Sequence, residues 1–118
     1  MDLRTLAYHW GAIKSNYAFD TLSSSPAEIS GYWQIYKRLI EEDLTPKSKV
    51  YVGKHQEVLD DPLHPIMEIG KLLQEGFSEL SEQKERFVKD GSFSAVDAVL
   101  AIAKLETVKR WTELMPEF

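Results

Sequence analysis

Apolar residues along the first part of the chain recur at the spacing of a helix. Five large side chains follow one another at alternating steps of three and four residues, which places them on one stripe of a helix surface. Asp2 precedes the stripe and is a residue type that caps helix N-termini. A run of three serines at 23–25 interrupts the pattern, so we predict that the first helix spans the residues between. The stripe consists of Leu3, Leu6, Trp10, Ile13 and Tyr17.

This first helix carries a second apolar line. Tyr8, Ala12 and Phe19 share a different side of the same helix, while a third side is polar. A helix with two apolar lines usually lies between two partners. We therefore expect the first helix to have more than one packing neighbour.

A second helix is predicted to begin at Pro26. The segment Ser25-Pro26-Ala27-Glu28 combines a capping box with proline at the first helical position. The helix should end at Thr45-Pro46, because a residue that precedes proline avoids helical dihedral angles. Its apolar face is broad and rich in rings. That face contains Ile29, Tyr32, Trp33, Tyr36, Leu39 and Ile40.

The pattern is weaker between the second helix and the next. The segment 49–53 alternates like a short strand, whereas 54–59 is compatible with one or two helical turns. We predict an irregular or short helical segment over about 46–64 and leave the conformation of Val50 to Gly53 open. The segment 60–65 contains two prolines and is predicted to be a turn.

Two further helices complete the pattern. Pro65 opens a third helix that should run without a break to Asp90-Gly91, where glycine ends it. Ser94 caps a fourth helix, which should end at Met115 before Pro116. Residues 95–103 are apolar almost all round and mostly small, as in a helix surrounded by close neighbours. We therefore predict an all-α, four-helix bundle-like single domain over residues 1–118, with the fourth helix central.

The amino-acid composition indicates the cellular compartment and the kinds of partner. The chain has no cysteine, which excludes disulfides and thiolate chemistry and favours a reducing compartment. It has no long apolar run and no signal-peptide pattern at its start, so we expect a cytoplasmic protein that does not engage membranes. The net charge is −5, and the 14 lysine and arginine residues are scattered, which argues against nucleic acid as a partner.

Catalytic patterns are weak. His64 and Glu68 have helical spacing near Asp60 and Asp61 and could begin a metal site. The simpler interpretation is that His64 caps the third helix and that Glu68 interacts with the helix dipole. The chain lacks a Gly-x-Ser-x-Gly elbow and a phosphate-binding glycine motif, so we expect no cofactor.

Large amphipathic rings are abundant, and they dominate interface energetics when they are not in the core. Most of these rings fall on stripes that we expect to face the core. The first two helices nevertheless carry more apolar surface than a four-helix bundle needs, which predicts a homodimer or a groove for a protein partner. We expect an interaction protein, such as an adaptor, dedicated chaperone or antitoxin-like or immunity-like inhibitor, rather than an enzyme. The predicted interaction residues are Tyr8, Phe19, Tyr32, Trp33 and Tyr36.

Two alternatives remain open from the sequence. One is a small metal-dependent hydrolase that uses His64 and Glu68 together with His9. The other is a sensor that binds a small molecule in an aromatic-lined pocket between the first, second and fourth helices.

Overall fold

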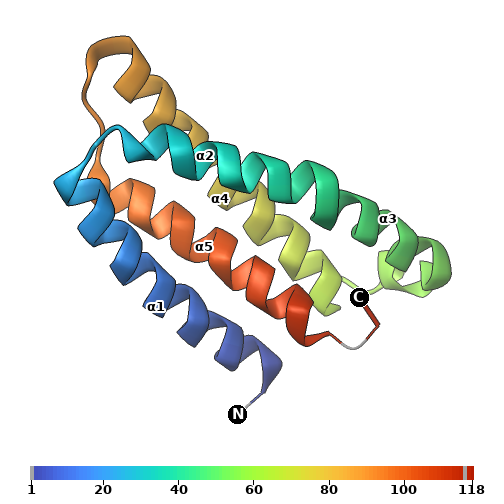
Figure 1. The fold of residues 1–118 in the computed structure, drawn as a ribbon. Coiled ribbons are helices and arrows are strands. Elements are labelled where there is room, and N and C mark those ends of the chain that lie inside the picture. Colours follow the sequence, from blue (N-terminus) through green and yellow to red (C-terminus); the bar gives the residue numbers. More distant parts are fainter. Residues whose placement is uncertain (1, 116) are drawn as a thin grey trace.

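The computed structural model describes residues 2–115 and 117–118, and these residues form helices and their connections (Figure 1). Two short helical turns separate the longer helices: a π-helical turn over Ile40–Leu44 and a 3₁₀ turn over Gln56–Asp60. The all-α, bundle-like fold is confirmed. The α-helices are α1 (Leu3–Ser24), α2 (Glu28–Leu39), α3 (Thr45–Lys54), α4 (Pro65–Asp90) and α5 (Ala95–Leu114).

The last helix is the centre of the bundle, as predicted. Helix α5 packs against both α1 and α4, and α2 packs mainly on α4 and closes one side (Figure 1). The small side chains in the first half of α5 allow these close contacts. Its buried residues are Ala98, Ala101, Ile102, Leu105, Thr107, Val108, Trp111 and Thr112.

Local capping chemistry places most helix ends where the sequence predicts them. The Asp2 carboxylate accepts a hydrogen bond from the Thr5 backbone N–H at 2.8 Å, and the Ser94 hydroxyl accepts one from Asp97 at 3.2 Å. Gly91 ends α4 with a φ of 74°, a left-handed conformation that glycine adopts without steric cost. Pro116, the predicted stop after the last helix, lies outside the described residues.

The start of the second helix differs from the prediction. Helix α2 begins at Glu28, two residues later than expected, and no side chain caps it. The backbone N–H of Glu28 instead donates to the Ser25 carbonyl at 3.0 Å, so a backbone turn replaces the predicted capping box.

The predicted helix end at Thr45-Pro46 is wrong. The chain continues from α2 through the π-helical turn into α3, and Val50 to Gly53 is helical. A proline ring clashes with the carbonyl four residues earlier in a regular helix. Here the turn before Pro46 is widened by one residue, because the Thr45 N–H donates to the Ile40 carbonyl. Pro46 itself falls in the first turn of α3, where a missing N–H is tolerated.

The segment predicted as irregular over 46–64 is therefore largely helical, as its short-helix alternative allowed. A small buried cluster packs this segment against the start of α4. It consists of Tyr51, Val58 and Ile66. Phe118 packs on the same cluster, with its ring centroid 5.9 Å from that of Tyr51. Tertiary contacts, including contacts with the C-terminal residue, thus stabilise a segment whose own pattern is ambiguous.

Candidate interaction surface

Helix α1 contacts α5 through small residues. Its buried positions are Ala7, Gly11, Ala18 and Leu22. A Cβ atom at Gly11 would lie 2.1 Å from the Thr107 Oγ1 and 2.6 Å from the Ala103 carbonyl oxygen, so the two backbones approach too closely for a side chain. The contact between α1 and α5 therefore admits only glycine at position 11, and Leu22 is the one large side chain among the four buried positions of α1.

This contact leaves the large apolar side chains of α1 outside the bundle. We call Leu3, Leu6, Trp10, Ile13 and Tyr17 the outer stripe. It lies about 100° around the helix from the buried line. Leu3, Leu6, Ile13 and Tyr17 are exposed, Ile13 at 50% and Tyr17 at 67%, and only Trp10 is half-buried. The expectation that these rings mostly face the core is wrong for this helix.

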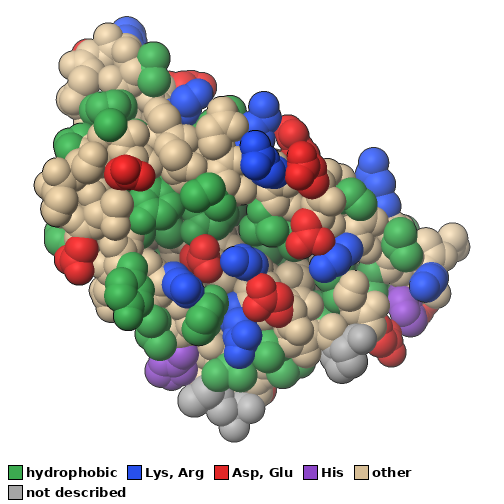
Figure 2. Space-filling model, in the orientation of Figure 1, with side chains coloured by type: hydrophobic (Ala, Val, Ile, Leu, Met, Phe, Trp, Pro, Cys, Tyr) green, Lys and Arg blue, Asp and Glu red, His purple; other side chains and the backbone are tan. Residues whose placement is uncertain are grey.

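Charged residues border the outer stripe on the side of α5. Figure 2 shows hydrophobic side chains along α1 and a band of basic and acidic side chains beside them over α5. The Lys14 ammonium lies 4.7 Å and the Arg110 guanidinium 5.0 Å from the Trp10 ring centroid. Arg110 also pairs with Glu113 at 3.4 Å. An apolar strip with a polar border is the usual composition of a protein interface.

The opposite flank of α1 borders a groove. Tyr8 and Phe19 are exposed on this flank. The groove has a volume of about 620 Å³ and is formed by α1, α4 and α5. Tyr8, Ala12 and Ser15 form its α1 wall, and α5 forms its floor.

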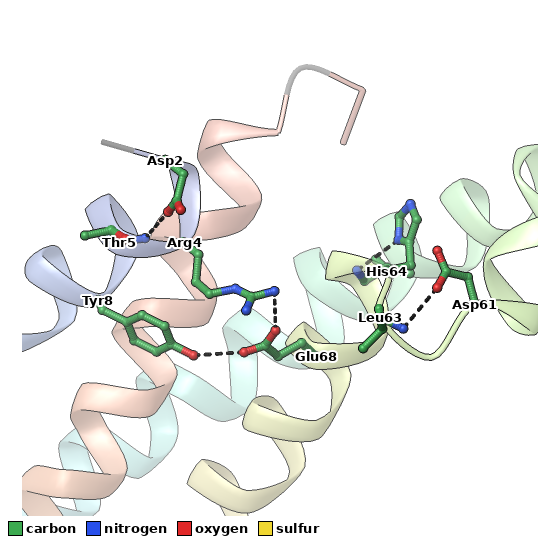
Figure 3. A network of polar contacts seen from close by, with 9 residues as sticks. Asp2, Arg4, Thr5, Tyr8, Asp61, Leu63, His64 and Glu68 are labelled. Carbon is green, nitrogen blue, oxygen red and sulfur yellow. Dashed lines mark hydrogen bonds and ion pairs between the residues drawn. The ribbon is translucent and has the colours of Figure 1, made fainter.

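A polar bridge joins α1 and α4 at Tyr8 (Figure 3). The Tyr8 hydroxyl donates to the Glu68 Oε1 at 3.1 Å, and the Arg4 Nη2 lies 2.6 Å from the Glu68 Oε2. Burial raises the pKa of Tyr8, and the hydrogen bond to the Glu68 carboxylate raises it further. The bridge links the two helices that form the groove walls.

The rings of α2 have a different environment from those of α1. Tyr32 and Trp33 are half-buried against the core. Trp33 stacks on Phe77 with ring centroids 5.8 Å apart, and its Nε1–H donates to the Ser81 hydroxyl at 2.8 Å. Lys84 places its ammonium 3.9 Å from the Trp33 ring centroid. Trp33 therefore joins α2 to α4, and Tyr32 packs partly against the core.

Tyr36 is buried, at 3% exposure. Its hydroxyl donates to the Glu106 Oε1 on α5 at 2.5 Å. Burial first, and this hydrogen bond second, raise the pKa of Tyr36 well above its ordinary value. Of the five predicted interaction residues, Tyr8 and Phe19 are therefore at the surface, Tyr32 and Trp33 are partly inside, and Tyr36 is in the core.

Two residues of the hydrolase alternative, His64 and Glu68, are engaged in structural contacts. The His64 Nδ1 accepts a hydrogen bond from the Ile66 backbone N–H at 3.2 Å, as the helix-cap interpretation predicts. The His64 ring and the Glu68 carboxylate point in different directions (Figure 3). His9 is exposed on α1. Among the described residues, no group of three or more His, Cys, Asp or Glu side chains could hold a metal ion.

The groove also differs from the pocket of the sensor alternative. That pocket was expected between the helices that correspond to α1, α2 and α5, with several rings around it. The groove lies between α1, α4 and α5, and Tyr8 is the single aromatic residue among the described residues that line it.

Sequence reasoning missed the small residues that decide the packing of α1. Ala7, Gly11 and Ala18 lie at helical spacing between the two apolar lines, and this third line could have been recognised as a contact surface for another helix. Gly76 on α4 has the same role, since a Cβ atom there would lie 3.1 Å from the Leu105 Cγ and the Lys104 Cβ.

No helix within the described part of the chain combines the length and apolar character that a membrane crossing requires. Comparison of the chain with models of protein families, with curated proteins and with solved structures gave no match in any of the three.

Proposed function

We propose that the protein is a non-enzymatic interaction module of the cytoplasm that forms a homodimer through the outer stripe of α1. The observation that supports this proposal is the exposure of a large apolar stripe at alternating steps of three and four residues. A monomeric protein rarely leaves such a continuous strip in water.

The spacing of the stripe suits another helix. Positions three and four apart in alternation are the a and d positions of a heptad, which pack as knobs into the holes of a facing helix. The distance from Leu3 to Tyr17 corresponds to about 21 Å of helix, or four turns. A second copy presents the same stripe, so a two-fold axis makes the two surfaces self-complementary.

An antiparallel arrangement about Trp10 uses this stripe best. It places Leu3 of one copy near Tyr17 of the other, so a small side chain meets a large one, and it places Leu6 near Ile13. It also keeps the two helix N-termini, with their like partial charges, apart. A stable dimer buries about 800 Å² on each partner, so the charged border beside the stripe would form the rim of this interface.

Replacement of Ile13 by lysine tests the proposal. In the dimer the substitution occurs twice and replaces a buried side chain worth about 1.5–3 kcal/mol with a charge, so we expect the dissociation constant to rise by about 100-fold or more. Light scattering after gel filtration at increasing protein concentration measures this change.

Val88→Lys is the matched control, because Val88 is 69% exposed near the C-terminal end of α4 and is not part of the stripe. The control should dimerise like the unmodified protein. An unmodified protein that stays monomeric at hundreds of micromolar, or equal dimerisation of both variants, contradicts the proposal.

A further inference from the structure

Phe118, far from α3 in the sequence, packs against that helix (Figure 1). Its backbone N–H donates to the Met115 carbonyl at 3.2 Å, and its ring centroid lies 5.9 Å from that of Tyr51. We call residues 117–118 the C-terminal segment. Together with α3 this segment lines a cavity of about 220 Å³ beside Tyr51, which is 8% exposed with the segment in place. The C-terminal segment therefore covers one side of α3.

His55, at the C-terminal end of α3, connects the C-terminal segment to the 3₁₀ turn. Its Nε2 lies 3.2 Å from the Glu117 Oε2, and its Nδ1 lies 3.5 Å from the Glu57 Oε1. A neutral imidazole has one N–H and can donate to one of these carboxylates. An imidazolium ring donates at both nitrogens and attracts both carboxylates by charge. The contact between His55 and Glu117 is therefore strongest when the ring is protonated.

Lysine side chains near His55 oppose this effect only in part. Lys47 and Lys54 are the lysines among the described residues that line the cavity. Lys47 is paired with Asp43 at 2.9 Å, which leaves Lys54 as the nearer competitor for Glu117. Two carboxylates and one competing lysine favour a positive charge on the His55 ring.

Tyr51 and His64 are the other titratable groups at this site. The His55 ring lies 4.6 Å from the Tyr51 ring, centroid to centroid, and the Tyr51 hydroxyl lies 3.5 Å from the His64 Nε2. Burial first, and the charges of Glu117 and Glu57 next, raise the pKa of Tyr51, so this phenol stays protonated at neutral pH. His64 lines a second cavity together with Glu117, but its Nδ1 serves the α4 cap. A proton at His64 would disturb that cap, so this ring needs its own control.

We propose that the C-terminal segment is a pH-sensitive switch, which protonated His55 holds against α3 through Glu117. The imidazole group changes its charge between about pH 5 and pH 8. Because the contact needs the charged ring, it is fully present in acid and is lost as the pH rises through this range. The segment then leaves α3 more often, and the side of α3 that contains Tyr51 becomes accessible. None of these residues belongs to the outer stripe, so the switch does not depend on the dimer.

The expected size of the effect suits a local switch. The Glu117 side chain is 65% exposed and that of His55 is 32% exposed. Ion pairs in such positions change an equilibrium by about two- to five-fold. A change of this size does not unfold a domain, but it is sufficient to shift the local equilibrium of a two-residue segment.

Nuclear magnetic resonance of the full-length protein with ¹³C-labelled phenylalanine tests the switch. The Tyr51 ring displaces the ring-proton resonances of Phe118 from their positions in urea at the same pH, and the displacement reports the docked fraction. These protons do not exchange with water, so the measurement is valid from pH 5.5 to pH 8.5. We expect the ratio of docked to undocked segment to be about two- to five-fold higher at pH 5.5 than at pH 8.5.

Two substitutions should abolish this pH dependence. His55→Gln keeps a hydrogen-bonding side chain but removes the titrating ring, and Glu117→Gln removes the charge that the ring attracts. Two others serve as matched controls. Glu57→Gln removes the partner of His55 that lies outside the C-terminal segment, and His64→Asn removes the second titrating ring while keeping a residue type that caps helices. Both controls should keep the pH dependence of the Phe118 resonances.

The proposal is supported if the displacement of the Phe118 resonances depends on pH in the unmodified protein and in both controls but not in His55→Gln or Glu117→Gln. Circular dichroism verifies that each variant is folded. A displacement that is the same at both pH values, or that changes equally in His55→Gln, overturns the proposal. Loss of the pH dependence in His64→Asn also overturns it, because His64 would then be the group that titrates. Loss in Glu57→Gln does so as well, because the ring would then act through the 3₁₀ turn.

Discussion

Helices α1 and α2 both carry rings at helical spacing, yet they use them in opposite ways. Helix α2 turns Trp33 and Tyr36 inward, where each ring finds a packing surface and a hydrogen-bond partner. Helix α1 turns Ile13 and Tyr17 outward and contacts α5 through alanine and glycine. The comparison shows that a line of large apolar residues need not be the buried face when a line of small residues lies beside it.

The reason is the geometry of close packing. Two helices that meet through glycine and alanine bring their backbones together, and many weak dispersion contacts then replace a few large side chains. Helix α5 is rich in small residues on all sides, so it accepts α1 in this way. The large side chains of α1 are then left for other partners.

Substitution of Gly11 by alanine is expected to have the largest effect on stability. The new Cβ would overlap the Ala103 carbonyl and the Thr107 hydroxyl, and we expect a loss of about 1–3 kcal/mol in the free energy of unfolding. Urea denaturation measures the loss. Gly70→Ala is the control, because a Cβ there meets nothing within 4 Å, and it should stabilise by about 0.5–1 kcal/mol. Equal effects of the two substitutions would show that α1 does not approach α5 closely.

Removal of one hydroxyl group compares the rings of the two helices directly. Tyr36→Phe leaves the Glu106 carboxylate without its buried donor, and we expect a loss of about 1–3 kcal/mol in the free energy of unfolding. Tyr17→Phe removes a hydroxyl from a ring that is mostly in water and should change the stability of the monomer by less than about 0.5 kcal/mol. A larger loss of unfolding free energy in Tyr17→Phe than in Tyr36→Phe would contradict this difference between the two helices.

The unfolding free energy at high pH should also distinguish the buried Tyr36 from an exposed tyrosine. The folded-state pKa of Tyr36 is raised above its unfolded value of about 10, so its contribution to stability is fully present below pH 10 and declines as the pH rises further. We expect the unfolding free energy of the unmodified protein to fall above pH 10 by up to about 1.4 kcal/mol per pH unit more than that of Tyr36→Phe. Denaturation at pH 8, 10 and 11 gives both slopes, and parallel slopes would argue that Tyr36 ionises in the folded state like an exposed tyrosine.

The smallest expected effect on folding is that of Ile13→Lys. At concentrations below the dissociation constant of the dimer, the unfolding free energy should change by less than about 0.5 kcal/mol, because this side chain is 50% exposed in the monomer. Thermal melting in this range is the measurement. A large destabilisation would place Ile13 in the core of the monomer.

Local chemistry made much of the fold predictable. Asp2, Ser94 and Gly91 mark helix ends because capping depends on a few neighbouring residues. Pro46 misled the prediction because the π-helical turn that accommodates it is held by tertiary contacts, with Leu44 of the turn buried beside Ile69 and Trp111, which the local sequence does not encode.

The candidate sites were predictable only in part. The excess of apolar surface on α1 followed from Tyr8 and Phe19, which form a second apolar line on another side of the helix from the first stripe. Which line is buried depends on the approach of Gly11 to Thr107, and the groove depends on three helices that are far apart in the sequence. The first feature has a local signal in the line of small residues on α1, whereas the groove has none.

Because the chain has no cysteine, disulfide cross-linking tests the outer stripe most directly. In the antiparallel dimer Leu6 of one copy lies near Ile13 of the other, so the double variant Leu6→Cys/Ile13→Cys should form a covalent dimer under mild oxidation. The two cysteines of one chain are seven residues apart on one helix, about 10 Å, too far to pair with each other. The account predicts rapid cross-linking of the double variant and little of either single variant. Equal cross-linking of the single variants, or none in the double variant, would contradict it.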